Sequence, residues 1–160
     1  MPDLSLSETY LRMLKEHEGI LYTICSLYTN SREDYEDLYQ EVAYQLWKAL
    51  PGFSGKSKIS TWMYKVALFT SFTHIRKKPK AAFLNFDEQS LESAEPVKQD
   101  KWIQLEKALK QLNDPDRAVM LLYLEGKSYK EMAEILDITE SNVGVRINRI
   151  KSKLKRMIDF

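Results

Sequence analysis

The chain is poor in the residues that cross-link small proteins or bind metals. Its 160 residues include one cysteine, Cys25, and two histidines, His17 and His74. A single cysteine excludes an intramolecular disulfide, and the histidines stand too far apart in the sequence for the usual ligand spacing of a structural zinc site. We therefore expect neither a metal nor another cofactor.

Long apolar runs are also absent. No stretch approaches the roughly 20 residues that a membrane-spanning helix requires. The first residues, Met1 to Leu4, lack the basic start and apolar stretch of a signal peptide. No glycine-rich phosphate loop and no nucleophile paired with a base is visible. These absences lead us to expect a cytoplasmic protein that is not an enzyme and has no small-molecule substrate.

The residues that are present indicate a globular, helical protein. Hydrophobic residues make up 44% of the chain and charged residues 29%. Apolar residues recur at the three- and four-residue spacing of helices, and the alternation typical of strands is nearly absent. The sequence therefore predicts an all-α fold of two small helical domains, residues 1–78 and 101–160. Residues 79–100, with two prolines and no periodicity, are the expected linker.

Helix boundaries in the first domain can be placed from turn-forming and capping residues. We expect one helix through residues 11–28, with Leu11 on its buried side. A second helix begins at about Arg32 and ends at Pro51. Ser57 is the expected N-cap of a third helix that runs to Lys78.

The second domain has the pattern of a helix-turn-helix. Asp114, placed before a proline, is the expected N-cap of one helix, Ser128 begins the next with capping-box spacing, and Thr139 caps the last. Ala133 and Val143 lie where two such helices must approach each other. The same pattern also fits an ordinary helical hairpin with a basic solvated face. The expected buried stripe of the last helix is Val143, Ile147, Ile150 and Leu154.

The net charge of +1 hides a separation of charges along the chain. Residues 33–41 hold five acidic and no basic residues, whereas residues 146–156 hold six basic and no acidic residues. The first segment suits a basic partner surface and the second a polyanion. In the third predicted helix, aromatic and basic residues are interleaved, which suits unpaired bases because rings stack on bases while cations follow the phosphates. Trp62 is equally a candidate for the core.

Two blocks of sequence together resemble a known family. The first block comprises residues 36–41, Leu46-Trp47, Phe53 and residues 60–67, and it resembles conserved region two of bacterial RNA polymerase sigma-70 factors of the extracytoplasmic-function type. The second block comprises residues 105–112 and 125–136 with Val143, Arg146 and Leu154, and it resembles region four. The blocks occur in the family's order and are joined by a short linker.

The resemblance implies a sigma factor that binds core RNA polymerase and directs initiation at specific promoters. In the family, region two docks on the clamp helices of the largest catalytic polymerase subunit and melts the minus-ten element, and region four reads the minus-thirty-five element. Many members are held by an anti-sigma factor, so such a protein is an expected partner beside polymerase and promoter DNA. A helix-turn-helix regulator that acts without polymerase is the alternative, but it would not need an acidic helix beside an aromatic, basic one.

Site residues follow from the resemblance by position. The expected polymerase-binding residues are Asp37, Leu38, Gln40 and Glu41. The expected minus-ten residues are Lys56, Lys58, Thr61, Trp62, Lys65, Phe69, Phe72, His74, Arg76, Lys77 and Lys78. The expected minus-thirty-five residues are Ser128, Thr139, Ser141, Asn142, Gly144, Val145, Arg146, Arg149, Lys151 and Lys153.

Three positions depart from the family's usual pattern. Phe69 stands where Asn is common, Thr73 where Asp is common, and Asp137 where Gly is common. The first two bear on individual minus-ten contacts. Asp137 is tolerable because Asp can adopt the left-handed backbone of a tight turn. Gly144, in the middle of the last helix, either lets the DNA approach the backbone or occupies a neutral surface position.

Overall fold

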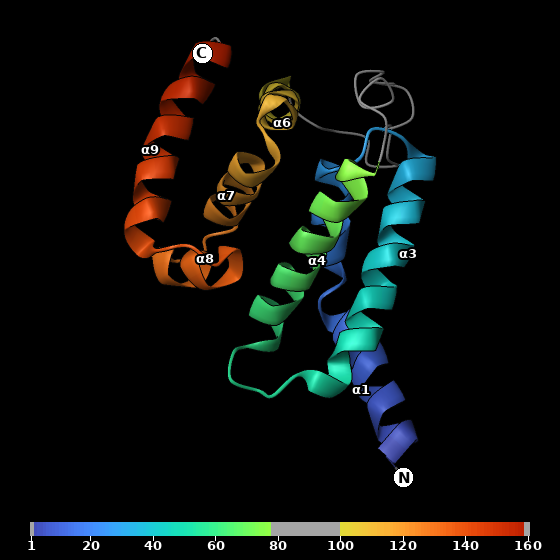
Figure 1. Ribbon diagram of the computed structural model, residues 1–160. Coiled ribbons are helices and arrows are strands. Elements are labelled where there is room, and N and C mark those ends of the chain that lie inside the picture. The colour runs from blue at the N-terminus through green and yellow to red at the C-terminus, as the bar shows by residue number, and fades with distance from the viewer. Residues whose placement is uncertain (1, 78–99, 159–160) are drawn as a thin grey trace. The chain divides into compact units, whose positions relative to one another are not determined.

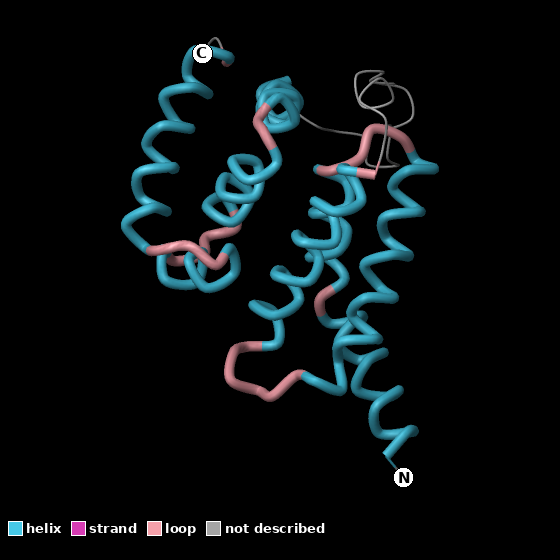
Figure 2. Tube along the Cα trace, in the orientation of Figure 1, coloured by secondary structure: helices cyan, strands magenta, loops and turns pink. Residues whose placement is uncertain are grey.

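The computed structural model describes residues 2–77 and 100–158, and the described residues form helices joined by turns, without a strand (Figures 1 and 2). This confirms the all-α prediction. The chain divides into two compact units, Met1–Leu91 and Glu92–Phe160. The predicted linker, residues 79–100, lies outside the described residues except for Asp100, which begins a helix. Within the described ranges, no helix is both long and apolar enough to cross a membrane.

The N-terminal unit is built around two long antiparallel helices, α3 and α4, which lie side by side in Figure 1. A shorter helix, α2, packs on both of them. The elements are α1 (Pro2–Glu16), α2 (Glu18–Leu27), α3 (Arg32–Ala49), the 3-10 helix η1 (Leu50–Gly52) and α4 (Ile59–Arg76). The side chains that meet between these helices and are fully buried include Leu21, Ile24, Leu38, Val42, Leu46, Met63, Ala67 and Leu68.

The single helix expected over residues 11–28 is wrong, because the chain forms two helices that break at His17. The backbone there has φ −122° and ψ 26°, and α2 restarts at Glu18. Gly19 weakens helix continuity at this point. The buried side of α1 is therefore not a continuation of the buried side of α2. Leu11, expected on the buried side, is 64% exposed.

The start of α3 agrees with the sequence, and the start of α4 does not. Ser31 caps α3, with its Oγ accepting a hydrogen bond from the backbone N–H of Asp34 at 3.1 Å. Ser57 was the expected cap of α4, but the helix begins one residue later, after Lys58. A lysine side chain has no acceptor atom, so this helix start has no side-chain cap.

The C-terminal unit contains α6 (Asp100–Gln111), α7 (Asp114–Leu124), α8 (Tyr129–Leu136) and α9 (Glu140–Met157). The short α8 lies across the ends of α7 and α9 (Figure 1) and packs on both. The predicted inward stripe of α9 is confirmed, since Val143, Ile147, Ile150 and Leu154 are all buried.

Local polar contacts shape the helix-turn-helix as predicted. Ser128 caps α8, with its Oγ accepting from the N–H of Glu131 at 3.1 Å. Thr139 caps α9, with its Oγ1 accepting from the N–H of Asn142 at 3.1 Å. Between the helices, Asp137 has a left-handed backbone, with φ 57° and ψ 46°. An aspartate therefore serves where a glycine is common in such turns.

The N-cap of α7 lies one residue earlier than expected. Asn113, and not Asp114, is the N-cap of α7, and its Oδ1 accepts from the N–H of Asp116 at 2.9 Å. Both residues have side-chain acceptors, so the choice between them depends on the backbone angles of the turn.

A buried arginine fastens the end of α6. Arg117 is 2% exposed, and its Nε donates to the carbonyl oxygen of Leu109 at 3.1 Å. Its Nη2 donates to the carbonyl oxygens of Lys110 at 2.8 Å and Leu112 at 3.0 Å. These carbonyl groups lie at the C-terminal end of α6, where the helix itself supplies few donors. The Arg117 guanidinium thereby caps the C-terminal end of α6 and links α6 to α7 by hydrogen bonds.

The lone cysteine is a core residue. Cys25 is fully buried in α2, and burial raises the pKa of its thiol to about 12. Because the thiolate is the reactive form, we expect no reaction of the folded protein with a chromogenic disulfide reagent near neutral pH, and complete reaction of the unfolded protein. Stoichiometric labelling of the folded chain within minutes would contradict this.

Candidate functional site

The acidic start of α3 presents a polar surface to solvent. Asp37 and Gln40 are exposed, as a docking role requires. Leu38 was expected to contact polymerase, but it is fully buried. It lies on the apolar stripe of α3 with Val42 and Leu46, so its side chain holds the helix in place and does not reach a partner in this conformation.

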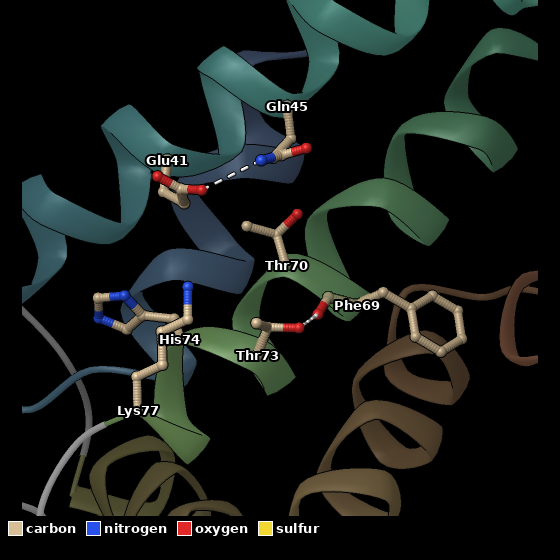
Figure 3. A pocket seen from close by; sticks show the side chains of 7 residues that line it. All are labelled: Glu41, Gln45, Phe69, Thr70, Thr73, His74 and Lys77. Atoms are coloured by element: carbon tan, nitrogen blue, oxygen red, sulfur yellow. Dashed lines mark hydrogen bonds between the residues drawn. The ribbon is translucent and has the colours of Figure 1, made fainter.

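Glu41, also expected to contact polymerase, is exposed. It lines a pocket of about 290 Å³ between α3 and α4, shown in Figure 3. The side-chain amide of Gln45 donates to its Oε1 at 3.1 Å. Glu41 therefore borders this pocket while it remains exposed, as Asp37 and Gln40 are. The pocket is lined by Glu41, Gln45, Phe69, Thr70, Thr73, His74 and Lys77.

The cations expected to follow the minus-ten strand are exposed on or beside α4. The exposed basic residues are Lys56, Lys58, Lys65, Arg76 and Lys77. Lys78 lies outside the described residues. Thr61, also expected to contact the strand, is only 7% exposed. It sits on the inward side of α4 near Met63, so its side chain is not presented to DNA.

Two of the predicted minus-ten aromatics contribute to packing. The ring of Trp62, which is half-buried, stands 5.1 Å from the ring of Phe53, centre to centre. Phe72 meets Tyr28 edge-on at 5.8 Å. Trp62 and Phe72 therefore pack against other aromatic rings of the unit. Phe69, which is 43% exposed, is more accessible to solvent than either of them.

A long-range hydrogen bond between side chains holds the end of α4. His74 Nε2 lies 2.8 Å from Asp34 Oδ1, and each side chain is only 15% exposed. The pair joins the last turn of α4 to the first turn of α3. His74, expected among the DNA contacts, is thus engaged within the protein, and no local sequence signal connects it with a residue 40 positions away.

The outer face of α9 carries the side chains expected to read DNA. Ser141 and Val145 are exposed, with Val145 at 63%. Arg146 is half-buried, and its Nε donates to Asn142 Oδ1 at 3.3 Å, one turn earlier. The side-chain oxygens of two further candidates, Ser128 and Thr139, already accept hydrogen bonds as helix caps. Lys153 is exposed.

Gly144 lies against α8 within the helix-turn-helix. A Cβ atom at this position would lie 3.5 Å from the ring of Tyr129, at the start of α8. The ring therefore covers the glycine, which is half-buried. Neither of the two sequence interpretations included this contact between α8 and α9.

Two of the expected DNA-binding cations are linked to α7. Arg149 Nη2 lies 3.9 Å from Asp116 Oδ1. Lys151 Nζ donates to the hydroxyl of Tyr123 at 2.6 Å, and this hydrogen bond raises the pKa of the Lys151 amine. Both cations stay at the surface, and their contacts with α7 restrict where they can meet a phosphate.

The described residues contain no group of three or more histidine, cysteine, aspartate or glutamate side chains that could hold a metal ion. What the two units offer is an acidic face on α3, a cationic and aromatic face on α4, and a helix-turn-helix with a basic outer surface.

Comparisons with known proteins agree with this arrangement. The family model for sigma-70 region 2 matches residues 13–80, and the model for sigma-70 region 4 matches residues 102–154. The RNA polymerase sigma factor YlaC of Bacillus subtilis is 29% identical over 80% of this chain and 79% of its own length. The ECF RNA polymerase sigma factor SigG of Mycobacterium tuberculosis is 38% identical over 46% of this chain, although the match spans only 19% of SigG.

A solved structure shows the same fold. RpoE of Bartonella quintana, crystallised in complex with the anti-sigma factor NepR, superposes with a TM-score of 0.72 at 18% identity, covering 96% of each chain. With regions 2 and 4 present in order, on two helical units with these surfaces, the chain belongs to the sigma-70 family of RNA polymerase sigma factors.

Proposed function

We propose that this protein acts in the cytoplasm, binds core RNA polymerase through α3, and directs the holoenzyme to promoters of its own specificity. Residues 1–78 dock on polymerase and open the minus-ten element, residues 79–100 connect the units, and residues 101–160 read the minus-thirty-five element. The observation that carries this proposal is the pairing, in one unit, of an exposed acidic helix start with a neighbouring cationic, aromatic helix.

The division of charge supports separate partners for the two helices. Asp37 and Gln40, on the open face of α3, suit a basic protein surface. The cations of α4 suit a phosphate backbone. A helix-turn-helix regulator acting alone would need only the C-terminal unit, which makes that alternative the weaker one. The protein performs no chemistry of its own in this proposal, because polymerase supplies the reaction.

An anti-sigma factor is the third proposed partner. The relative from Bartonella quintana was crystallised with one. Such a protein would inhibit by covering surfaces that polymerase or DNA requires, so we expect it to compete with core polymerase for this chain.

Charge reversal tests the docking face. Asp37→Lys is expected to weaken binding to core polymerase at least tenfold, because an attraction across the interface becomes a repulsion. Binding is measured by titrating labelled protein with core enzyme, and initiation by run-off transcription. Glu8→Lys, an equally exposed change of charge on α1, is the matched control.

The outcomes separate the two functions. Weaker core binding with an unchanged circular-dichroism spectrum and melting temperature supports docking through α3. Core affinity equal to that of the control would contradict it. If the wild-type chain confers no promoter-specific initiation on core polymerase, the sigma-factor proposal itself fails.

A further inference from the structure

Lys151 is held at the surface of the C-terminal unit by a side chain of α7. Its Nζ donates a hydrogen bond to the hydroxyl oxygen of Tyr123 at 2.6 Å and lies 4.4 Å from the centre of the Tyr123 ring. The two residues are 28 positions apart in the sequence, and the helices that carry them, α7 and α9, pack against each other (Figure 1). A contact between two helices therefore fixes the end of a long side chain that would otherwise sample many rotamers.

The backbone at Tyr123 is itself fixed by the way in which α7 ends. The N–H of Gly126, a residue with a positive φ of 79°, donates to the Tyr123 carbonyl oxygen at 3.1 Å. The N–H of Lys127 donates to the carbonyl oxygen of Leu122, also at 3.1 Å. These two hydrogen bonds form the Schellman motif that ends many helices. Because Tyr123 is also half-buried, its hydroxyl group is carried by a rigid part of the unit.

Other cations of α9 are held less closely than Lys151. Arg149 Nη2 lies 3.9 Å from Asp116 Oδ1, which is too long for a hydrogen bond, and the Arg149 side chain is 65% exposed. Arg156 Nε donates to a carbonyl oxygen of α9 itself, at 3.4 Å. The contact of Lys151 is the shortest of these three, so its ammonium group has the best defined position.

The hydrogen bond with Tyr123 leaves Lys151 able to bind a phosphate group. Lys151 is exposed, and an ammonium group has three N–H donors, of which Tyr123 uses one. The other donors are available for phosphate oxygens. A lysine side chain that is already held in place loses less conformational freedom when it binds DNA than one that is free to move. The hydroxyl of Tyr123 can therefore favour a phosphate contact without touching the phosphate.

We propose that Tyr123 is a positioning residue for binding of the minus-thirty-five element, and that it holds the Lys151 ammonium group where a backbone phosphate meets α9. This rests on the proposed function, in which residues 101–160 bind that element. Tyr123 acts through Lys151 and adds no charge of its own. Removal of its hydroxyl group should therefore reduce the affinity for promoter DNA, while the number of phosphate contacts stays the same.

A double-mutant cycle tests this role. Holoenzymes containing wild-type, Tyr123→Phe, Lys151→Ala or the doubly substituted protein are titrated with a labelled duplex promoter that was recovered by selection with the wild-type holoenzyme. Fluorescence anisotropy gives each affinity at several salt concentrations. Tyr123→Phe removes the hydroxyl group and keeps the ring, so the packing of α7 is retained. A matched cycle uses Lys153→Ala in place of Lys151→Ala, because Lys153 is an exposed cation two positions further along α9.

Tyr123→Phe is expected to lower promoter affinity about fivefold, because the Lys151 side chain must then be ordered on binding. In the Lys151→Ala background the same substitution should change affinity by less than about 1.5-fold, whereas in the Lys153→Ala background the loss of about fivefold should remain. The slope of log affinity against log salt concentration should be unchanged in Tyr123→Phe. It should become shallower by about one in Lys151→Ala, because only that variant loses a phosphate contact.

Other results overturn the positioning role in distinguishable ways. An equal loss in both lysine backgrounds would mean that the hydroxyl group stabilises the unit and does not act through Lys151. Unchanged affinity in Tyr123→Phe or in Lys151→Ala would remove the role, and a gain in Tyr123→Phe would mean that the hydroxyl group withholds Lys151 from DNA. All of these results leave the proposed function standing if the wild-type holoenzyme still depends on the minus-thirty-five sequence. A wild-type holoenzyme without that dependence would contradict both.

Discussion

Replacing Arg117 with methionine is expected to destabilise the C-terminal unit by roughly 3 kcal/mol or more, because each buried carbonyl group that loses its donor costs about 1–3 kcal/mol. Three carbonyl oxygens, those of Leu109, Lys110 and Leu112, accept hydrogen bonds from this guanidinium, and the Leu109 oxygen also accepts one from the backbone N–H of Leu112 at 3.2 Å. A domain typically has only about 5–15 kcal/mol of total stability. Such a loss would therefore expose the unit to partial unfolding at moderate temperature.

Hydrogen exchange measured on the full-length protein locates the effect. Amide protection should fall across residues 103–158 in Arg117→Met and stay unchanged across residues 5–77. Arg156→Met serves as the control, since Arg156 is exposed and its Nε makes a hydrogen bond of 3.4 Å to the Ser152 carbonyl oxygen at the surface. Equal protection in the two variants would show that the buried hydrogen bonds of Arg117 contribute little net stability.

Arg146→Ala is expected to relax sequence preference at one or two minus-thirty-five positions. The side chain stands near the start of α9, and a bidentate contact between an arginine and guanine contributes about 1–3 kcal/mol of discrimination. Asn142 contacts the Arg146 Nε at 3.3 Å and so helps to hold it in position. Binding of the holoenzyme to a library of minus-thirty-five sequences measures the preference directly.

Lys153→Ala provides the comparison for that experiment. Lys153 is exposed further along α9, where a cation reaches phosphate and not a base edge. Its loss should weaken all promoters alike and reduce the salt dependence of binding. If Arg146→Ala also weakens all sequences uniformly, Arg146 contacts the backbone. If neither variant binds more weakly, α9 does not enter the groove.

Features set by neighbours in sequence were predictable. The stripe from Val143 to Leu154 follows from helical periodicity alone, and Thr139 caps α9 because its side chain reaches an amide three residues later. Where two adjacent residues could both cap, as at Asn113 and Asp114, the pattern could not choose between them. The break at His17 was hidden because the apolar spacing continues on both sides of it.

Features that depend on the folded chain were not predictable from one sequence. The pair of His74 with Asp34 joins residues 40 positions apart. Arg117 follows Asp114-Pro115-Asp116 at a charged helix start, where the sequence gives no sign that the arginine is buried. A family motif contains both buried residues that pack the helices and exposed residues that can contact a partner, and the position in the motif alone does not distinguish them. Leu38 and Thr61 lie in motifs whose other residues we expect to contact polymerase or DNA, but both side chains are buried and pack within the helices.

The ring of Tyr129 over Gly144 has a consequence for engineering promoter specificity. A Cβ atom at position 144 would make an ordinary van der Waals contact of 3.5 Å with this ring, so a larger side chain would require the ring, which belongs to an exposed tyrosine, to move. A helix transplanted from another protein with a bulky side chain there would displace the Tyr129 ring and alter the packing of α8 on α9. A chimera that is designed to change promoter specificity should therefore take α8 and α9 together from the same protein.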